Sequence, residues 1–511
     1  MQKDFSTVTP DGTPLRFQAA RAALSSGTSQ AVTRVLAVVL SVVTARALEP
    51  RDVGLLGLAV IVMGVISMVG FYPETAAVTA AGTASDSRYA LAASVIRALI
   101  IAALLALLAL VFAPLASGLT SEAGGAAQLR RLLMVLALLP ALELISGYPQ
   151  VVLQRKLDLN YVAWVQLLQP IIFVGLVVVL LYEGQGYIGV AQANVAGAAI
   201  AALFVWFRVW WRGWLVWDGM PSRADWREAL RGTARMFMGG FGGYLGERAD
   251  NLLVAGAIGP TAMSFYSMAW NASRTPANVF ARAINFVLVP TLARIQDEPD
   301  RVQKALGECL RHSYILLAPI CAVLFVSAPR LVTYILGPKW LPLVPCLRIM
   351  CFTVLAIPVL FASNALLVGL GRAHLTGIAT VIHILVLIAI IPPLATRWGI
   401  VGAACGDLIA VMVLTFTLCY TARVAMRQVK WGLASSLVVP VVAAFSAGLM
   451  AWGAAHYLPN DLTRLVAEAC LVLIGYFIFV ILLGGKNRLF DLTALLRGVF
   501  RRPTVAAQLH T

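Results

Sequence analysis

Charged side chains are scarce in this chain of 511 residues. Asp, Glu, Lys and Arg together make up 12% of the sequence, hydrophobic residues make up 60%, and the mean hydropathy is +0.86. A soluble domain of this length cannot hide so much apolar surface from water. The composition therefore excludes a soluble globular protein and predicts an integral membrane protein.

Paired cysteines and catalytic acids are also missing. The seven cysteines contain no CxxC pair and no metal-ligand spacing, so we predict small buried hydrophobic residues and no metal site. A membrane-embedded glycosyltransferase or polysaccharide polymerase would need acidic residues in an outer connection. The longest outer connection, roughly residues 114–128, has Glu122 as its only acid. The sequence therefore predicts neither an enzyme nor a cofactor.

Apolar runs of about 20 residues, the length that crosses a bilayer, recur along the whole chain. They predict an all-α integral membrane protein with about fourteen transmembrane helices. The predicted ranges are 22–46, 53–80, 89–113, 129–153, 161–182, 187–207, 232–257, 263–290, 309–335, 341–370, 375–396, 399–423, 433–457 and 464–483.

Basic residues are distributed unequally between the two sides of these helices. If the N-terminus is cytoplasmic, 25 of the 39 Lys and Arg residues fall in cytoplasmic segments and eight fall in outer segments. Cytoplasmic loops are rich in Lys and Arg, so both termini are predicted to be cytoplasmic. Loops that face anionic lipid headgroups explain the net charge of +16, and nucleic acid is not an expected partner.

A short self-similarity divides the chain into two halves. Residues 45–50 align with 255–260 at an offset of 210, and residues 186–189 align with 399–402 at an offset of 213. An even number of helices separates equivalent positions, so the two repeats run parallel. The predicted organisation is a cytoplasmic lead (1–21), an N-lobe of helices 1–6 (22–207), a basic Trp-rich cytoplasmic linker (208–231), a C-lobe of helices 7–12 (232–423), helices 13–14 (433–483) and a basic cytoplasmic tail (484–511).

Six arginines lie inside the apolar runs, where charge is costly and usually functional. They are Arg34, Arg97, Arg248, Arg274, Arg282 and Arg348. The eighth predicted helix carries a polar stripe, which consists of Asn271, Arg274, Asn278, Arg282 and Asn285. Spacings of three and four residues put this stripe on one helical face over about 21 Å.

We expect the polar stripe to line a substrate path between the lobes, with contributions from Arg34 and Arg248. Arginine-lined surface suits an anionic cargo such as a diphosphate. The alternative is that Arg274 or Arg282 only pairs with a carboxylate of the seventh predicted helix.

Carboxylates in or beside the apolar runs are candidates for ion coupling. They are Glu74, Glu143, Glu247 and Asp250. These side chains would carry protons or bind Na⁺, and structural pairing with arginine is the alternative. His383, in the eleventh predicted helix, either serves a proton relay or packs with one satisfied nitrogen.

Four segments and one proline carry a family resemblance. They are residues 46–55 (RALEPRDVGL), 248–259 (RADNLLVAGAIG), 265–269 (FYSMA) and 276–279 (PANV), with Pro290. These segments resemble the Wzx-type polysaccharide flippases, in the polysaccharide transporter branch of the multidrug/oligosaccharidyl-lipid/polysaccharide (MOP) exporter superfamily. Glu74 departs from the pattern, because it follows a Tyr-Pro where relatives often carry an apolar or Gly-rich turn.

The resemblance implies two parallel bundles in a V, a central cationic cavity and alternating access in a bacterial inner membrane. Family members move polyprenyl-diphosphate-linked oligosaccharide repeat units between the leaflets, for cell-surface or exocellular polysaccharide synthesis. The resemblance therefore implies several partners. They are this lipid-linked cargo, membrane lipids, H⁺ or Na⁺, and a polysaccharide polymerase with export machinery. A multidrug exporter of the same superfamily would share the scaffold but should present a neutral or acidic cavity to organic cations. The intramembrane arginines favour the flippase.

Overall fold

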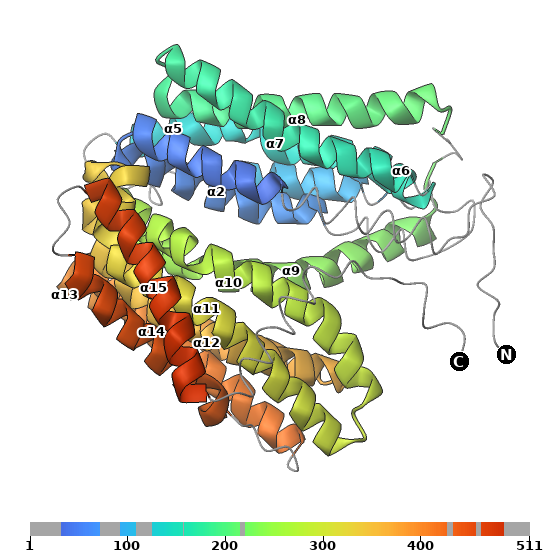
Figure 1. Cartoon of the computed structure of the whole chain (residues 1–511). Helices are drawn as coiled ribbons and strands as arrows, with labels where there is room; N and C mark the ends of the chain where they lie inside the picture. Colours follow the sequence, from blue (N-terminus) through green and yellow to red (C-terminus); the bar gives the residue numbers. More distant parts are fainter. Residues whose placement is uncertain are drawn as a thin grey trace. The chain divides into compact units, whose positions relative to one another are not determined.

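The fold is seen in a computed structural model, in which all regular secondary structure of the described residues is helical (Figure 1). The structure describes residues 32–71, 92, 94–108, 125–156, 158–214, 220–426, 433–455 and 461–484. The chain divides into two compact units, Met1–Ser264 and Phe265–Thr511. The predicted all-helical fold class is confirmed.

The first unit contains residues 32–47 and 94–108, both helical, and a series of longer helices. These are α2 (Pro50–Phe71), α5 (Gly125–Leu136), α6 (Leu138–Arg155), α7 (Leu159–Tyr182), α8 (Gly186–Trp211) and α9 (Arg223–Ile258). α8 packs against α6 and α7, and α2 packs against α5, α6 and α9. Figure 1 shows α7 and α8 side by side, joined by a short turn.

Close backbone approach fixes α2 against α9 and the first turn of the next helix. The Tyr244 hydroxyl of α9 donates a hydrogen bond of 3.2 Å to the Ile61 carbonyl of α2. A Cβ atom on Gly54 would overlap the carbonyl of Pro260, so a larger residue does not fit at this position without a backbone shift.

The described part of the second unit contains long α-helices and one short 3₁₀ helix. They are α10 (Pro260–Arg294, whose first residues belong to the first unit), α11 (Pro299–Ile335), η1 (Pro338–Leu343), α12 (Val344–Gly369), α13 (Ala373–Ala425), α14 (Leu433–Ala455) and α15 (Asp461–Gly484). α12 packs extensively on α13, and α11 contacts α12, α14 and α15. One apolar cluster of this unit joins α10, α11, α12 and α13 around Leu306 and Leu366.

α13 is two helices joined at Gly399, as the separate predicted ranges 375–396 and 399–423 required. Gly399 has φ 61° and ψ −142°, a conformation that L side chains rarely adopt. A Cβ on Gly402 would overlap the carbonyl of Leu394, so the chain turns back tightly on itself here. His383 contacts the carbonyl of Ala410, which shows that the two halves of α13 lie side by side.

Eight helices in the described part of the chain are long and apolar enough to cross a membrane. Two shorter apolar helices, Ser94–Leu108 and Leu437–Gly453, accompany them. The chain is therefore a multi-pass membrane protein, while the count of fourteen helices and the predicted lobe boundaries stay predictions.

Two helices begin earlier than their apolar patterns predicted. α9 begins at Arg223 and not at residue 232, because Ser222 and Asp225 form a capping box at its start. α11 begins at Pro299 and not at residue 309, with proline in the first turn. The apolar pattern identifies only the part of a helix that suits lipid. Polar turns before that part are predicted from capping residues and not from hydropathy.

Candidate functional site

The predicted polar stripe lies on α10, which continues past its two internal prolines. Asn271 is exposed, and Arg274 and Asn278 are half-buried. The side chains of Arg282 and Asn285 lie outside the described residues, although the backbone there is helical. The helix therefore keeps the predicted spacing of the stripe.

Arg274 is held by a buried carboxylate. Its Nη2 donates to both carboxylate oxygens of Asp407, at 3.0 Å to Oδ1 and 2.7 Å to Oδ2. The Arg274 guanidinium also lies over the ring of Trp270, 4.9 Å from the centroid. The Arg274 side chain is 16% exposed and that of Asp407 is 3% exposed, so the ion pair is largely buried.

The sequence did not predict this pairing. A carboxylate of the seventh predicted helix was the alternative partner expected for Arg274 or Arg282, whereas Asp407 belongs to the second half of α13. Asp407 was missed because 133 residues separate the pair and no local spacing links them. A signal was present, since Asp407 is the only acidic residue between Glu308 and Asp461 and lies inside an apolar run.

His383 brings a third titratable group to this ion pair. It is 7% exposed, and its Nδ1 lies 3.1 Å from the Ala410 carbonyl oxygen, the packed arrangement with one satisfied nitrogen. It also lies within electrostatic range of both Asp407 and Arg274. Since His383 and Asp407 come from the two halves of α13, the reversal at Gly399 brings them together. We call Arg274, Asp407 and His383 the charged cluster.

A buried ion pair of this kind is weak support for stability by itself, because desolvation of both charges offsets their attraction. Removing one partner is far more costly, since the other charge then stays buried without compensation. The arrangement therefore constrains Arg274 to a partner of negative charge, either Asp407 or an anion that replaces it.

A separate polar pocket lies within the first unit. It has a volume of about 190 Å³ and is lined by α6, α7 and α8, with Glu143, Gln150, Gln166 and Gln169 among its walls. Glu143 Oε2 is buried without a hydrogen-bond partner among the described residues. Among the ion-coupling candidates that the structure describes, Glu143 lines this polar pocket. The glutamines were missed, although Gln166 and Gln169 are spaced to share a face of α7.

The candidates on α9 have different environments. Glu247 is exposed and Arg248 is half-buried. Asp250 is 4% exposed, and its Oδ1 accepts hydrogen bonds from the backbone and side-chain nitrogens of Asn251, at 2.8 and 2.9 Å. Asp250 is thus satisfied locally, whereas Glu247 is open to its surroundings.

The remaining predicted residues lie at the edge of the described structure or beyond it. Arg34 is half-buried on the helical segment 32–47, and Glu74 lies outside the described residues. Convergence of Arg34 with the α10 stripe stays a prediction.

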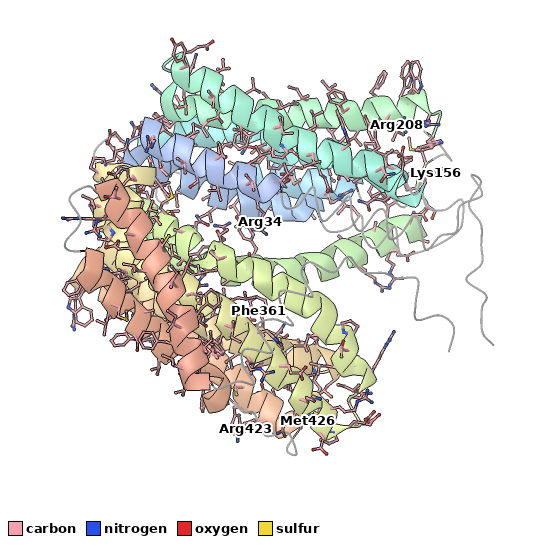
Figure 2. All side chains as sticks on the ribbon, viewed as in Figure 1. Arg34, Lys156, Arg208, Phe361, Arg423 and Met426 are labelled. Atoms are coloured by element: carbon pink, nitrogen blue, oxygen red, sulfur yellow. The ribbon has the colours of Figure 1, made fainter. Side chains whose placement is uncertain are left out.

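Two basic residues, Lys156 and Arg208, lie at one end of the first unit (Figure 2). Figure 2 shows Lys156 and Arg208 at the same end, after α6 and near the end of α8. Arg208 donates to Asp158 at 2.8 Å and lies over the ring of Tyr161, 4.8 Å from the centroid. Both basic residues belong to predicted cytoplasmic segments.

Comparison with curated proteins finds bacterial relatives, one of them a lipopolysaccharide biosynthesis protein. The chain is 24% identical over 270 residues to an uncharacterized membrane protein in the cps region of Klebsiella pneumoniae, a match that covers 51% of this chain and 53% of that protein. It is 24% identical over 172 residues to the lipopolysaccharide biosynthesis protein WzxC of Escherichia coli K12, with 34% and 35% covered. The chain therefore matches about half of the first relative's length and about a third of the second's.

Solved structures share the fold. The inward closed conformation of the lipid II flippase MurJ superposes with a TM-score of 0.74 at 12% identity, covering 90% of this chain and 98% of that one. An inward-facing MATE family multidrug resistance transporter of the MOP superfamily superposes with a TM-score of 0.64 at 15% identity, covering 77% and 94%. Identities this low support the fold alone.

The family assignment comes from a sequence match of more than half the chain. The family described as polysaccharide biosynthesis protein matches residues 43–345, a range that contains α2 and the polar stripe. The resemblance to Wzx-type flippases is confirmed. Because this match covers more than half of the chain, the chain belongs to the polysaccharide biosynthesis protein family.

Proposed function

We propose that this protein flips polyprenyl-diphosphate-linked oligosaccharide repeat units across the bacterial inner membrane by alternating access. The observation that supports this most directly is Arg274, a largely buried guanidinium in the middle of α10 of a polysaccharide biosynthesis protein. A planar guanidinium can grip two oxygens at once, which suits a diphosphate better than it suits a cation or a neutral drug.

Asp407 gives this proposal a mechanism. The Asp407 carboxylate and the diphosphate of the cargo are alternative anionic partners of the same guanidinium. Without cargo, Asp407 neutralises Arg274 and lowers the cost of its charge in the membrane. When cargo arrives, its phosphate oxygens replace those of Asp407. The freed carboxylate then needs a proton or a cation, and His383 is the nearby group that can exchange a proton.

The polar pocket around Glu143 is the second element of the proposal. A carboxylate with one unpartnered buried oxygen among glutamine side chains offers oxygen ligands to a proton or Na⁺. We propose that this pocket contributes to ion coupling, with Glu247 as the exposed alternative on α9.

The proposed topology places both termini in the cytoplasm. The clustering of Lys156 and Arg208 at one end of the first unit supports it, because cytoplasmic ends of membrane helices are rich in basic residues (Figure 2). A polysaccharide polymerase and export machinery are the expected partners, since they consume a flipped repeat unit. We propose a transporter without catalytic residues.

The decisive experiment is an analysis of lipid-linked intermediates in a deletion strain. Loss of the protein should leave repeat units on the cytoplasmic leaflet, where an impermeant galactose- or amine-reactive probe cannot reach them in intact spheroplasts, while surface polysaccharide disappears. A multidrug exporter of the same fold would instead leave the glycan unchanged and alter resistance to organic cations. Normal surface polysaccharide in the deletion strain would refute the proposed function.

A further inference from the structure

The second unit contains an apolar crevice that the proposed transport path does not use. It has a volume of about 450 Å³ and is lined by α11, α12 and α14. Its walls are almost wholly apolar, and the only charged side chain among its lining residues is Arg348. Its volume is within the range of about 300–1,000 Å³ that is typical of small-molecule sites.

Two observations indicate that the crevice opens toward lipid. Phe352, Phe445 and Trp452 line it and are 51%, 68% and 68% exposed. The helices that carry them are apolar over most of their length, so in a membrane their exposed faces meet acyl chains. The crevice is therefore accessible from the bilayer.

The long dimension of the crevice matches one leaflet. On α14 its lining extends from Val441 to Trp452, which is about 16 Å at 1.5 Å per residue. Half of a hydrocarbon core about 30 Å thick is about 15 Å. Arg348 follows the start of α12 by four residues, and Trp452 is three residues before the end of α14, so both lie at the same mouth. Arginine and tryptophan are typical of the membrane interface.

Arg348 is fixed in place but is not neutralised by a carboxylate. Its Nε donates to the carbonyl of Phe325 at 3.1 Å, and its guanidinium lies 5.5 Å from the centroid of the Phe325 ring. Within the part of the chain that the structure describes, no acidic side chain pairs with Arg348. The charge therefore stays available to an anion at the mouth of an apolar crevice.

We propose that this crevice binds one anionic phospholipid, with an acyl chain along α14 and the headgroup phosphate on Arg348. An apolar slot one leaflet deep with a single guanidinium at its mouth has the shape and charge pattern of such a molecule. The predicted topology places this mouth on the outer side, where α11 ends and α12 begins. The proposal does not depend on the cargo.

Lipid binding to the purified full-length protein in a nonionic detergent tests this. Native mass spectrometry would compare phosphatidylglycerol with phosphatidylcholine of the same chain length. Phosphatidylglycerol should bind about tenfold more tightly, because its headgroup is a net anion whereas the choline cation of phosphatidylcholine offsets its phosphate. Arg348→Gln should abolish this preference by weakening phosphatidylglycerol binding more than phosphatidylcholine binding.

Two control variants match the test variants. Arg397→Gln removes an exposed arginine that precedes an exposed tryptophan, Trp398, away from the crevice, and it should keep the lipid preference. Ala322→Phe fills the crevice from α11 and should weaken both lipids, whereas Leu385→Phe, at a 60% exposed position of α13, should weaken neither. If Ala322→Phe does not fold, the two arginine variants decide the outcome.

Equal affinity of the parent protein for the two lipids would overturn the proposal. Equal losses of phosphatidylglycerol affinity in Arg348→Gln and Arg397→Gln would also overturn it. Polyprenyl phosphate also carries a phosphate on a long apolar chain, so it is tested as a competitor of phosphatidylglycerol for the crevice. If polyprenyl phosphate displaces phosphatidylglycerol with tenfold higher affinity, the crevice holds the cargo's lipid and the phospholipid proposal is wrong.

Discussion

Arg274 and Asp407 provide a test that separates transport from stability. Asp407 is 3% exposed, so removing Arg274 alone leaves a buried carboxylate without its cation. Breaking such a pair typically costs about 3–5 kcal/mol, whereas replacing both charges by apolar residues is often neutral or stabilising. A single Arg274→Ala variant therefore confuses loss of cargo binding with loss of folding.

The informative variant is the double substitution Arg274→Leu with Asp407→Leu. We expect its free energy of unfolding to be within about 1 kcal/mol of the parent, because no unpaired charge stays buried. Each single variant should be less stable by about 3 kcal/mol. Stability is measured by unfolding in sodium dodecyl sulfate, and export by the amount of surface polysaccharide in a complemented deletion strain.

Export should be lost in the double variant, since the guanidinium that we propose binds the diphosphate is gone. The ion pair between Arg330 of α11 and Glu468 of α15 is a matched control in the same unit, with Glu468 only 1% exposed. Arg330→Leu with Glu468→Leu should be folded and should still export. If the Arg274 and Asp407 double variant exports at the parental rate, the pair is structural and its proposed role in cargo binding is wrong.

The remaining predictions concern the proton, the backbone and the topology. Glu143→Gln should keep membrane abundance but reduce export at least tenfold under a proton or sodium gradient, and unchanged export in energised vesicles would exclude the pocket from coupling. Gly54→Leu should lower the unfolding midpoint because its side chain overlaps the backbone of Pro260, whereas Gly57→Ala, which meets only the flexible end of Met263, should be tolerated. A cysteine in place of Met220, which is 78% exposed, should react with an impermeant maleimide only after cell lysis on a cysteine-free background, and labelling of intact spheroplasts would reverse the predicted orientation.

Local patterns in the sequence were sufficient to predict the all-helical fold class and the helical spacing of the polar stripe. The stripe on α10 follows from spacings of three and four residues, which depend only on the geometry of one helix. The break near Gly399 also came from local composition, because a charged residue, Arg397, and a glycine interrupt the apolar pattern.

The residues that contact Arg274 and Glu143 could not be predicted from local patterns. Asp407 reaches Arg274 only after α13 reverses and packs near α10, so the contact depends on tertiary structure. The pocket around Glu143 likewise combines three helices, and neutral glutamines give a weaker signal than charges in a hydropathy pattern. The early start of α9 was missed for the opposite reason, since its capping box is local but polar, and the prediction followed apolar residues alone.

The reversal at Gly399 has a consequence for motion. His383 and Asp407 sit on two packed halves of one hairpin and are tied by the contact to Ala410, so they move together. Arg274 instead lies two residues before Pro276, whose missing amide removes one backbone hydrogen bond and weakens α10 at that point. Deformation near the charged cluster is therefore concentrated in α10. In hydrogen exchange, amides around residues 272–278 should exchange faster than those of residues 403–410, and cargo should slow the first group while leaving the second unchanged.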